Sequence, residues 1–346
     1  MKKYIFYSVL VVTLNSCTKT LDFDDSGLAN QVVVNSIISP DSYFTSYITK
    51  SSSILEDRQN NPAADGSMDL YEDGNLIRQF PTQSGGFSDT NIFPEAGKTY
   101  RMVVTSNGKT LEAETKIPNQ AEVISVDTST VKNEFGQWTN YKVNIKDPSG
   151  EDYYRLVLMS ESLSFYTSKD SLGNDKRYYM ANIYQSLFNS DDPVFKSLYN
   201  NFGQDVIDAG PNNDYAIFTD DYFQGKEYSL QFNVYYGGGY GYSDAGNPKL
   251  SSGVIYVRSI IHVQKLSKEL FKYLKYLNLY DFYHDNPFSE PVPVYSNVQN
   301  GIGIFAGFND DTKFDFEKIY IPYSMDTIKV EDGYYGGGYY YGNNGN

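Results

Sequence analysis

Residues 67–80 read SMDLYEDGNLIRQF, and this stretch decides the fold class. Apolar and polar side chains alternate up to Tyr71, which is the period of a half-buried β-strand. Asp73-Gly74 follows, and this dipeptide favours a tight turn between two antiparallel strands. An apolar-rich segment then returns toward Phe80. The stretch therefore predicts a β-hairpin, and it indicates a protein built mostly of β-structure.

Short strands of the same kind fill the region around this hairpin. Residues 31–38 are rich in β-branched side chains and end before Pro40, and Asn107-Gly108 marks a second hairpin turn. About seven strands at intervals of about ten residues, with little helical periodicity, are typical of an immunoglobulin-like sandwich. We therefore expect an immunoglobulin-like β-sandwich over residues 31–118.

A second, larger β-domain is expected over residues 119–330. Its least regular part is 160–215, whose many Asn, Asp, Ser and Tyr residues predict a long excursion. One amphipathic helix is predicted near residues 265–280, because apolar residues recur on one face from Leu266 to Leu277. Such a stripe is typical of a helix that packs on its own sheet.

The N-terminus has the features of a lipoprotein export signal. Two lysines precede an apolar run over residues 4–14, which is too short for the roughly 20 residues of a membrane-spanning helix. The run ends at Leu14-Asn15-Ser16-Cys17, which resembles a lipobox although Asn15 fits it poorly. Cys17 is the only cysteine of the 346 residues, so no disulfide or thiol site explains it. We predict a signal peptide over residues 1–16 and lipidation of Cys17.

The segment after Cys17 is expected to be an acidic tether over residues 17–30. Its aspartates Asp22, Asp24 and Asp25 resemble the signals that send some lipoproteins to the cell surface. The whole chain has a formal net charge of −15, which excludes binding to nucleic acid or anionic lipid through charge alone. The expected location is the outer membrane, with a lipid anchor and exposure at the cell surface.

Tyrosine is unusually frequent, with 34 Tyr against a single Trp. The first interpretation is a Tyr-rich sheet, but two Gly/Tyr segments, 235–242 and 334–341, have another possible role. Tyrosine offers a large contact area at low entropic cost, and glycine keeps the backbone adaptable. We therefore interpret four tyrosines as candidate partner-binding residues, and we expect residues 331–346 to form a disordered tail. The four are Tyr235, Tyr236, Tyr240 and Tyr242.

The sequence contains few residues that could carry chemistry. Its two histidines, His262 and His284, lie near no nucleophile-elbow motif and in no zinc-binding pattern. Adjacent acidic pairs such as Asp220-Asp221 lack the spacing of a calcium loop, although bound calcium stays an open question. We predict that the chain is not an enzyme and has no cofactor and no metal site. A hydrolase with two distant carboxylates is the remaining enzymatic alternative.

Several motifs together resemble one protein family. They are KLSKELFKYL (265–274), NPFSEPV (286–292), VYSNVQNGIGIFAG (294–307), LYEDG (70–74), PEAGKTY (94–100) and FTDDYFQGK (218–226). The chain resembles the Bacteroidota lipoprotein family designated domain of unknown function 4249, over nearly all of its mature length. It departs from the family pattern at Gln299-Asn300-Gly301, where one glycine stands in place of two, and in its Gly/Tyr tail.

The resemblance implies a location and a class of partner but no reaction. Members of this family look like surface lipoproteins that accompany TonB-dependent outer-membrane transporters. We therefore expect a non-enzymatic accessory subunit of such a transporter, or of another outer-membrane complex, held to the membrane by the lipid on Cys17. The alternative is a lipoprotein that binds glycans or peptides through its Tyr-rich loops. The residues Ser296-Asn297 and the glycines after them are interpreted as structural before functional.

Overall fold

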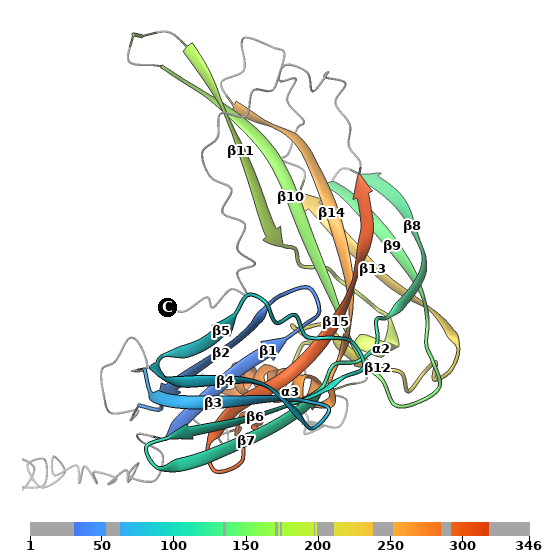
Figure 1. The fold of residues 1–346 in the computed structure, drawn as a ribbon. Coiled ribbons are helices and arrows are strands. Elements are labelled where there is room, and N and C mark those ends of the chain that lie inside the picture. The colour runs from blue at the N-terminus through green and yellow to red at the C-terminus, as the bar shows by residue number, and fades with distance from the viewer. Residues whose placement is uncertain are drawn as a thin grey trace, which may run out of the picture.

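The computed structural model describes residues 31–52, 63–133, 136–169, 172–173, 175–196, 198, 211–237, 252–284 and 292–317. It confirms that the chain is mostly β, with β-sandwich character (Figure 1). The first strands in chain order are β1 (Val32–Ile38), β2 (Phe44–Lys50), β3 (Asp65–Glu72), β4 (Asn75–Ser84), β5 (Gly86–Asp89), β6 (Thr99–Ser106) and β7 (Lys109–Lys116). The others are β8 (Glu122–Asn133), β9 (Gly136–Lys146), β10 (Tyr153–Lys169), β11 (Asp175–Gln185), β12 (Ile217–Thr219), β13 (Glu227–Gly237), β14 (Ser252–Leu266) and β15 (Ile302–Glu317). The described helices are the short α2 (Pro193–Lys196) and the longer α3 (Lys268–Tyr283).

The described strands form three sheets. The largest has the strand order β11-β10-β14-β15-β1-β2-β5, and β12 pairs with β10 beside this path. A four-stranded sheet has the order β4-β3-β6-β7, and a three-stranded sheet has the order β13-β9-β8. Each small sheet covers a different part of the large one, so the large sheet belongs to two sandwiches.

The first sandwich contains the hairpins that the sequence predicted. The turn at Asp73 and Gly74 has φ values of 46° and 82°, and the turn at Asn107 and Gly108 has φ values of 50° and 73°. Two successive positive φ angles are what a tight hairpin turn requires, which explains the residue types. The alternating side chains face a core that is closed to solvent. Its members include Val34, Ile48, Leu70, Tyr100, Leu111 and Phe305.

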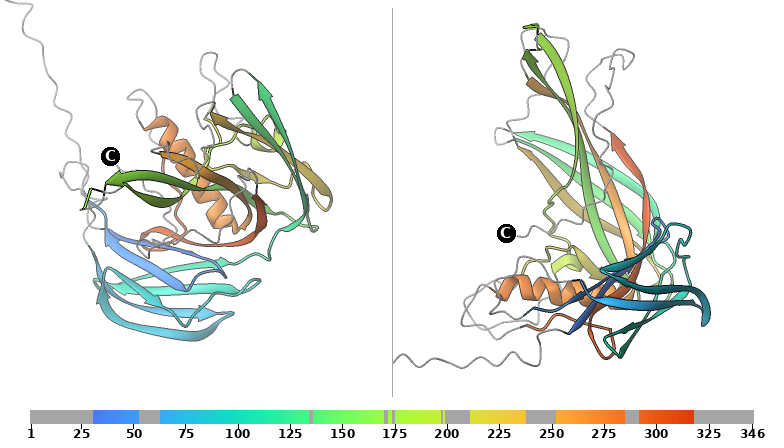
Figure 2. Two further views of the ribbon diagram at one scale, coloured as in Figure 1. Left: turned by 90° about the horizontal axis from the view of Figure 1, so that it is seen from above. Right: turned by 60° about the vertical axis from the view of Figure 1, so that its left-hand side comes forward.

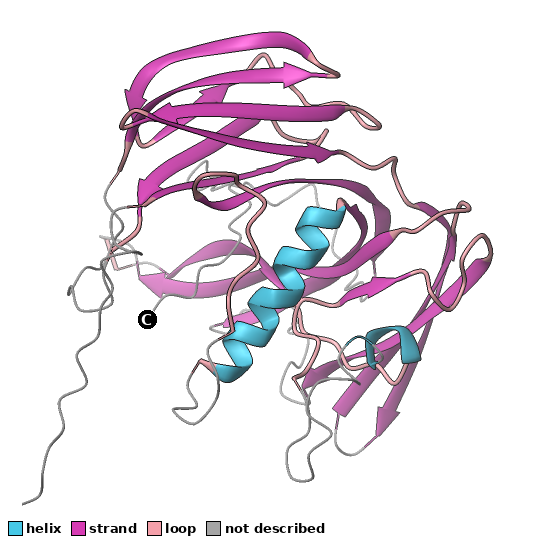
Figure 3. Ribbon diagram, turned by 90° about the horizontal axis from the view of Figure 1, so that it is seen from below, coloured by secondary structure: helices cyan, strands magenta, loops and turns pink. Residues whose placement is uncertain are grey.

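The second sandwich and the long helix enclose two further cores. The sheet β13-β9-β8 packs on β10 and β14 around aromatic side chains, among them the stacked rings of Tyr141 and Phe232. Helix α3 lies across the large sheet (Figure 3), with its buried face toward Tyr153 and Ile304. Its bounds, 268–283, confirm the helix predicted near residues 265–280. In the described part of the chain, neither helix combines the length and apolar composition that a membrane-crossing segment needs.

Strand β15 joins the two sandwiches. Its first part runs parallel to β1, from Val33 opposite Ile302 to Ile38 opposite Gly307. Its second part runs antiparallel to β14. The first sandwich, which we call the first module, therefore lies on one side of β15, and the sheet β8-β9-β13 lies on the other (Figure 2). Strands from before and after residue 118 thus share one sheet. That residues 31–118 form a domain of their own stays a prediction.

The prediction of irregular structure over residues 160–215 is wrong for the first half of that range. Strands β10 and β11 pair without interruption from Met159 opposite Gln185 to Lys169 opposite Asp175. They form a long hairpin that reaches away from the first module (Figure 1). The many Asn, Asp, Ser and Tyr residues of this region indicated irregular structure, but the backbones of the two strands pair continuously. We refer to the paired part, residues 159–185, as the β10–β11 arm.

Candidate functional site

The residues that the sequence marked as functional lie mostly outside the described part of the chain. This holds for Cys17, Tyr240 and Tyr242. The backbones of Tyr235 and Tyr236 are described, and they continue β13 opposite Trp138 and Gln137 of β9. The side chains of these two tyrosines are not described, so their role in binding a partner stays a prediction.

Both histidines have structural surroundings. His262 on β14 is 7% exposed, and its Nδ1 atom lies 3.0 Å from Oδ2 of Asp310 on β15. Gln264 donates from Nε2 to the same oxygen at 3.2 Å, so one carboxylate joins the two strands. His284 is exposed at the end of α3, where its Nδ1 atom lies 2.9 Å from the carbonyl oxygen of Asp281. His262 is therefore a buried residue of β14, and His284 is the residue that caps the end of α3.

The motif residues near the C-terminus hold the backbone together. Asn297 donates from Nδ2 to the carbonyl oxygens of Glu114 at 3.2 Å and Phe305 at 2.8 Å. Its Oδ1 accepts the Phe305 N–H at 2.9 Å. One side chain thus ties the 292–301 segment to β7 and β15. Gly303 has φ +122°, and a Cβ there would lie 1.9 Å from the carbonyl oxygen of Val34. Both positions therefore have the structural role that the sequence indicated.

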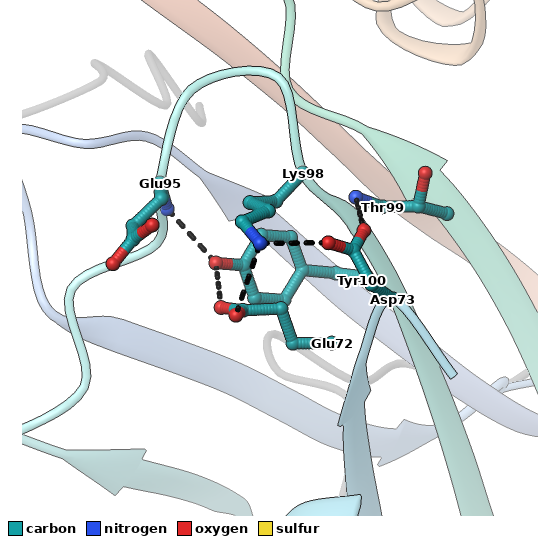
Figure 4. A network of polar contacts seen from close by, with 6 residues as sticks. All are labelled: Glu72, Asp73, Glu95, Lys98, Thr99 and Tyr100. Carbon is teal, nitrogen blue, oxygen red and sulfur yellow. Dashed lines mark hydrogen bonds and ion pairs between the residues drawn. The ribbon is translucent and has the colours of Figure 1, made fainter. Parts of the chain in front are cut away.

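The motif residues of the first module form a polar network around Tyr100 (Figure 4). The buried Tyr100 hydroxyl donates to Oε2 of Glu72 at 2.5 Å and accepts the Glu95 N–H at 2.8 Å. Asp73 accepts from Nζ of Lys98 at 2.8 Å. Burial raises the pKa of the Tyr100 hydroxyl, and the hydrogen bond to Glu72 raises that pKa further. The network joins the β3–β4 turn to the segment before β6, so LYEDG and PEAGKTY also serve the scaffold.

A group of acidic side chains lies at the edge of the second sandwich. One carboxylate oxygen from each of Asp147, Asp152 and Asp220 lies within 4.8 Å of the other two. Asp147 follows β9, Asp152 precedes β10, and Asp220 follows β12. We call these three residues the aspartate cluster.

Strand pairing explains why the aspartate cluster forms. Tyr153 of β10 is paired with Thr219 of β12, so the residues next to them, Asp152 and Asp220, meet at the strand ends. Asp147 is fixed beside the β12–β13 loop, because its N–H donates to the carbonyl oxygen of Lys226 at 3.1 Å. From the sequence, Asp220 was considered only as half of the acidic pair Asp220-Asp221, and nothing there connects it with Asp147, although both residues directly follow strands.

The cluster holds more negative charge than its surroundings compensate. Lys265 of β14 reaches it, with Nζ 2.6 Å from Oδ2 of Asp152. Burial raises the pKa of the Asp220 carboxyl above its usual range, and the charges of Asp147 and Asp152 also raise it. Three oxygen-bearing side chains close together are chemically able to hold a hard cation.

The fold and these sites define a class of protein: two β-sandwiches that share one sheet, with motif residues that serve the scaffold. The family model described as domain of unknown function (DUF4249) matches residues 18–314. The chain therefore belongs to this family, as its motifs indicated. No curated protein matches the chain.

Proposed function

We propose that this protein is a non-enzymatic lipoprotein on the surface of the outer membrane. In this proposal the lipid on Cys17 anchors it, and it serves as an accessory subunit of a TonB-dependent transporter or another outer-membrane complex. The export signal and the lone cysteine support the anchor. The structural roles of both histidines favour binding over catalysis, since the described ring contacts hold strands and a helix end.

The β10–β11 arm is the observation that carries the binding role. It extends the large sheet beyond the first module (Figure 1), and β11 is the outermost strand in the order of the described sheet. An outermost strand presents backbone donors and acceptors on one side, and these can pair with a strand of another protein. A surface that reaches outward in this way is suited to contact a neighbouring membrane protein.

Apolar side chains at the base of the arm add to this surface. Ile183 near the end of β11 is 66% exposed, and Leu187 just after it is 87% exposed. Large apolar side chains that gather in one exposed region are typical of sites that bind another protein. The partner we propose is therefore a β-barrel of the outer membrane, which offers both strand edges and apolar surface.

The anchor can be tested separately from the partner. We expect the unaltered protein to fractionate with the outer membrane and the Cys17→Ser variant to lose its acyl chains and leave that fraction. Mass spectrometry of the mature N-terminus gives a second reading. An unmodified Cys17 on the mature wild-type protein would contradict the anchor.

The partner can be tested by affinity purification of the tagged full chain in mild detergent. We expect a barrel protein to be recovered with the unaltered chain and to be lost with Ile183→Asp and Leu187→Asp together. The matched control is Leu76→Asp with Ile77→Asp, because these residues are also exposed but lie on β4 of the first module. The proposal fails if the unaltered chain is recovered alone. It also fails if both double variants keep the partner equally.

A further inference from the structure

The aspartate cluster contains a buried carboxylate oxygen without a partner. Asp220 is 1% exposed, and its Oδ2 atom has no hydrogen-bond partner among the described residues. The carboxyl group faces the cluster, since one of its oxygens lies within 4.8 Å of oxygens from Asp147 and Asp152. A buried oxygen of this kind costs about 1 to 3 kcal/mol unless something binds it. Such an atom in a native fold points to an ion or a water at that position.

The other two carboxylates are held in place by contacts with neighbouring residues. Asp147 accepts the hydroxyl hydrogen of Tyr154 on Oδ1 and the Gly225 N–H on Oδ2, the latter at 2.8 Å. Asp152 is paired with Lys265 through Oδ2. These contacts fix the direction of both carboxyl groups without neutralising more than one charge. The cluster is thus prepared to receive a ligand.

The charge of the cluster indicates the charge of that ligand. In their ionised form the three carboxylates carry three negative charges against the single ammonium of Lys265, in a place where Asp147 and Asp220 are buried. Buried like charges at this separation are unfavourable unless a cation lies between them. A divalent cation would neutralise the cluster.

We propose that Asp147, Asp152 and Asp220 bind one divalent cation of the calcium class. All three ligands are carboxylate oxygens, which suit Ca²⁺ or Mg²⁺, whereas zinc prefers nitrogen and sulfur. Two ligands on opposite sides of a Ca²⁺ ion lie at most about 4.8 Å apart, because each Ca–O distance is about 2.4 Å. The mutual separations in the cluster fit within one such coordination sphere. Calcium also accepts irregular ligand arrangements, whereas Mg²⁺ requires a smaller octahedron.

The bound cation would join three elements that backbone hydrogen bonds already place side by side. It would connect the end of β9, the start of β10 and the loop between β12 and β13. Backbone hydrogen bonds already order this loop, since the Phe223 N–H donates to the carbonyl oxygen of Asp220 and the Lys226 N–H donates to the carbonyl oxygen of Phe223, both at 2.8 Å. The ion would therefore fix the base from which β10 extends into the arm.

The test uses the purified full chain in mild detergent, treated with a chelator and then titrated with calcium chloride. We expect calorimetry to show one site with a Kd on the order of 0.1 to 1 mM, the range of extracellular calcium modules. At about ten times that concentration the Tm should rise by about 2 °C or more.

Two substitutions separate the site from general effects of charge. Asp220→Asn keeps the shape of the side chain and should weaken calcium binding at least tenfold. Asp221→Asn removes the same charge one residue away, where the side chain is exposed and bonded to the Thr219 hydroxyl, and should leave binding unchanged. The wild-type titration decides the matter even if Asp220→Asn fails to fold. Absence of heat and of a Tm shift at 10 mM calcium would overturn the proposal. An equal response to Mg²⁺, or unchanged binding by Asp220→Asn, would overturn it as well.

Discussion

Replacing Gly303 by alanine tests whether the parallel contact between β1 and β15 determines stability. Gly303 lies opposite Val34, with φ +122°, and a Cβ there would be 1.9 Å from the Val34 carbonyl oxygen. The neighbour is backbone in the middle of a sheet, so it cannot turn aside as a side chain would. The two strands must therefore separate at the point where the sandwiches join.

The expected cost combines three contributions. A non-glycine residue at positive φ costs about 1 to 2 kcal/mol. Forcing a methyl group into closely packed surroundings costs typically about 1 to 3 kcal/mol more. Each backbone hydrogen bond lost between β1 and β15 adds about 1 kcal/mol. We expect Gly303→Ala to lower the free energy of unfolding by about 3 to 6 kcal/mol, a large part of the roughly 5 to 15 kcal/mol typical of a folded protein.

Gly108→Ala is the matched control, because it has the strain without the clash. Gly108 has φ +73°, and a Cβ there would meet nothing within 4 Å. We expect it to cost only about 1 to 2 kcal/mol. Denaturant unfolding followed by circular dichroism measures both values. If the two variants lie within about 1 kcal/mol of each other, the close approach of β15 to β1 does not have the role assigned to it.

Further predictions concern the polar contacts. Tyr100→Phe leaves Glu72 and the Glu95 N–H without their shared hydroxyl, so we expect a loss of about 1 to 3 kcal/mol in denaturant unfolding, whereas Tyr47→Phe, at an exposed ring, should change nothing. For Asp73, the hydrogen bond from Lys98 lowers the pKa, so its contribution to stability is present above its ordinary pKa of 3.8 and is lost as the pH falls through the lowered value. The difference in unfolding free energy between the wild type and Asp73→Asn should therefore be present at neutral pH and disappear at pH values below 3.8. A difference that stays constant with pH would contradict this. Asn297→Ala removes three hydrogen bonds and should cost about 2 to 4 kcal/mol, against little change for Asn91→Ala on the surface.

Local features of the fold were predictable because local physics determines them. Both hairpin turns follow from residues that accept positive φ, and helix α3 follows from its apolar stripe and the Ser267 N-cap. The pairing of β1 with β15 was not predictable, since nothing in either strand specifies a partner so distant in the chain. The β10–β11 arm was missed because the many Asn, Asp, Ser and Tyr residues of that region were interpreted as irregular structure, although the two strands pair continuously.

The candidate site shows the same difference between what a sequence displays locally and what only strand pairing brings together. Each aspartate of the cluster is visible in the sequence, but only the register between β10 and β12 brings Asp152 beside Asp220. The family motifs led to a different outcome. Asn297 and Gly303 were interpreted from the sequence as structural before functional, and their contacts with backbone agree, so these motifs reflect the packing of β15 against its neighbours.

The position of β15 also determines when the chain can finish folding. Strand β1 is synthesised early, whereas its partner over residues 302–307 is synthesised after nearly all of the described chain. Until then the edge of β1 stays open and the first core lacks Phe305, a condition that favours aggregation. Contacts between distant parts of a chain also form slowly. We therefore expect a chain truncated before residue 302 to aggregate or to be degraded, even though both hairpins of the first module are complete.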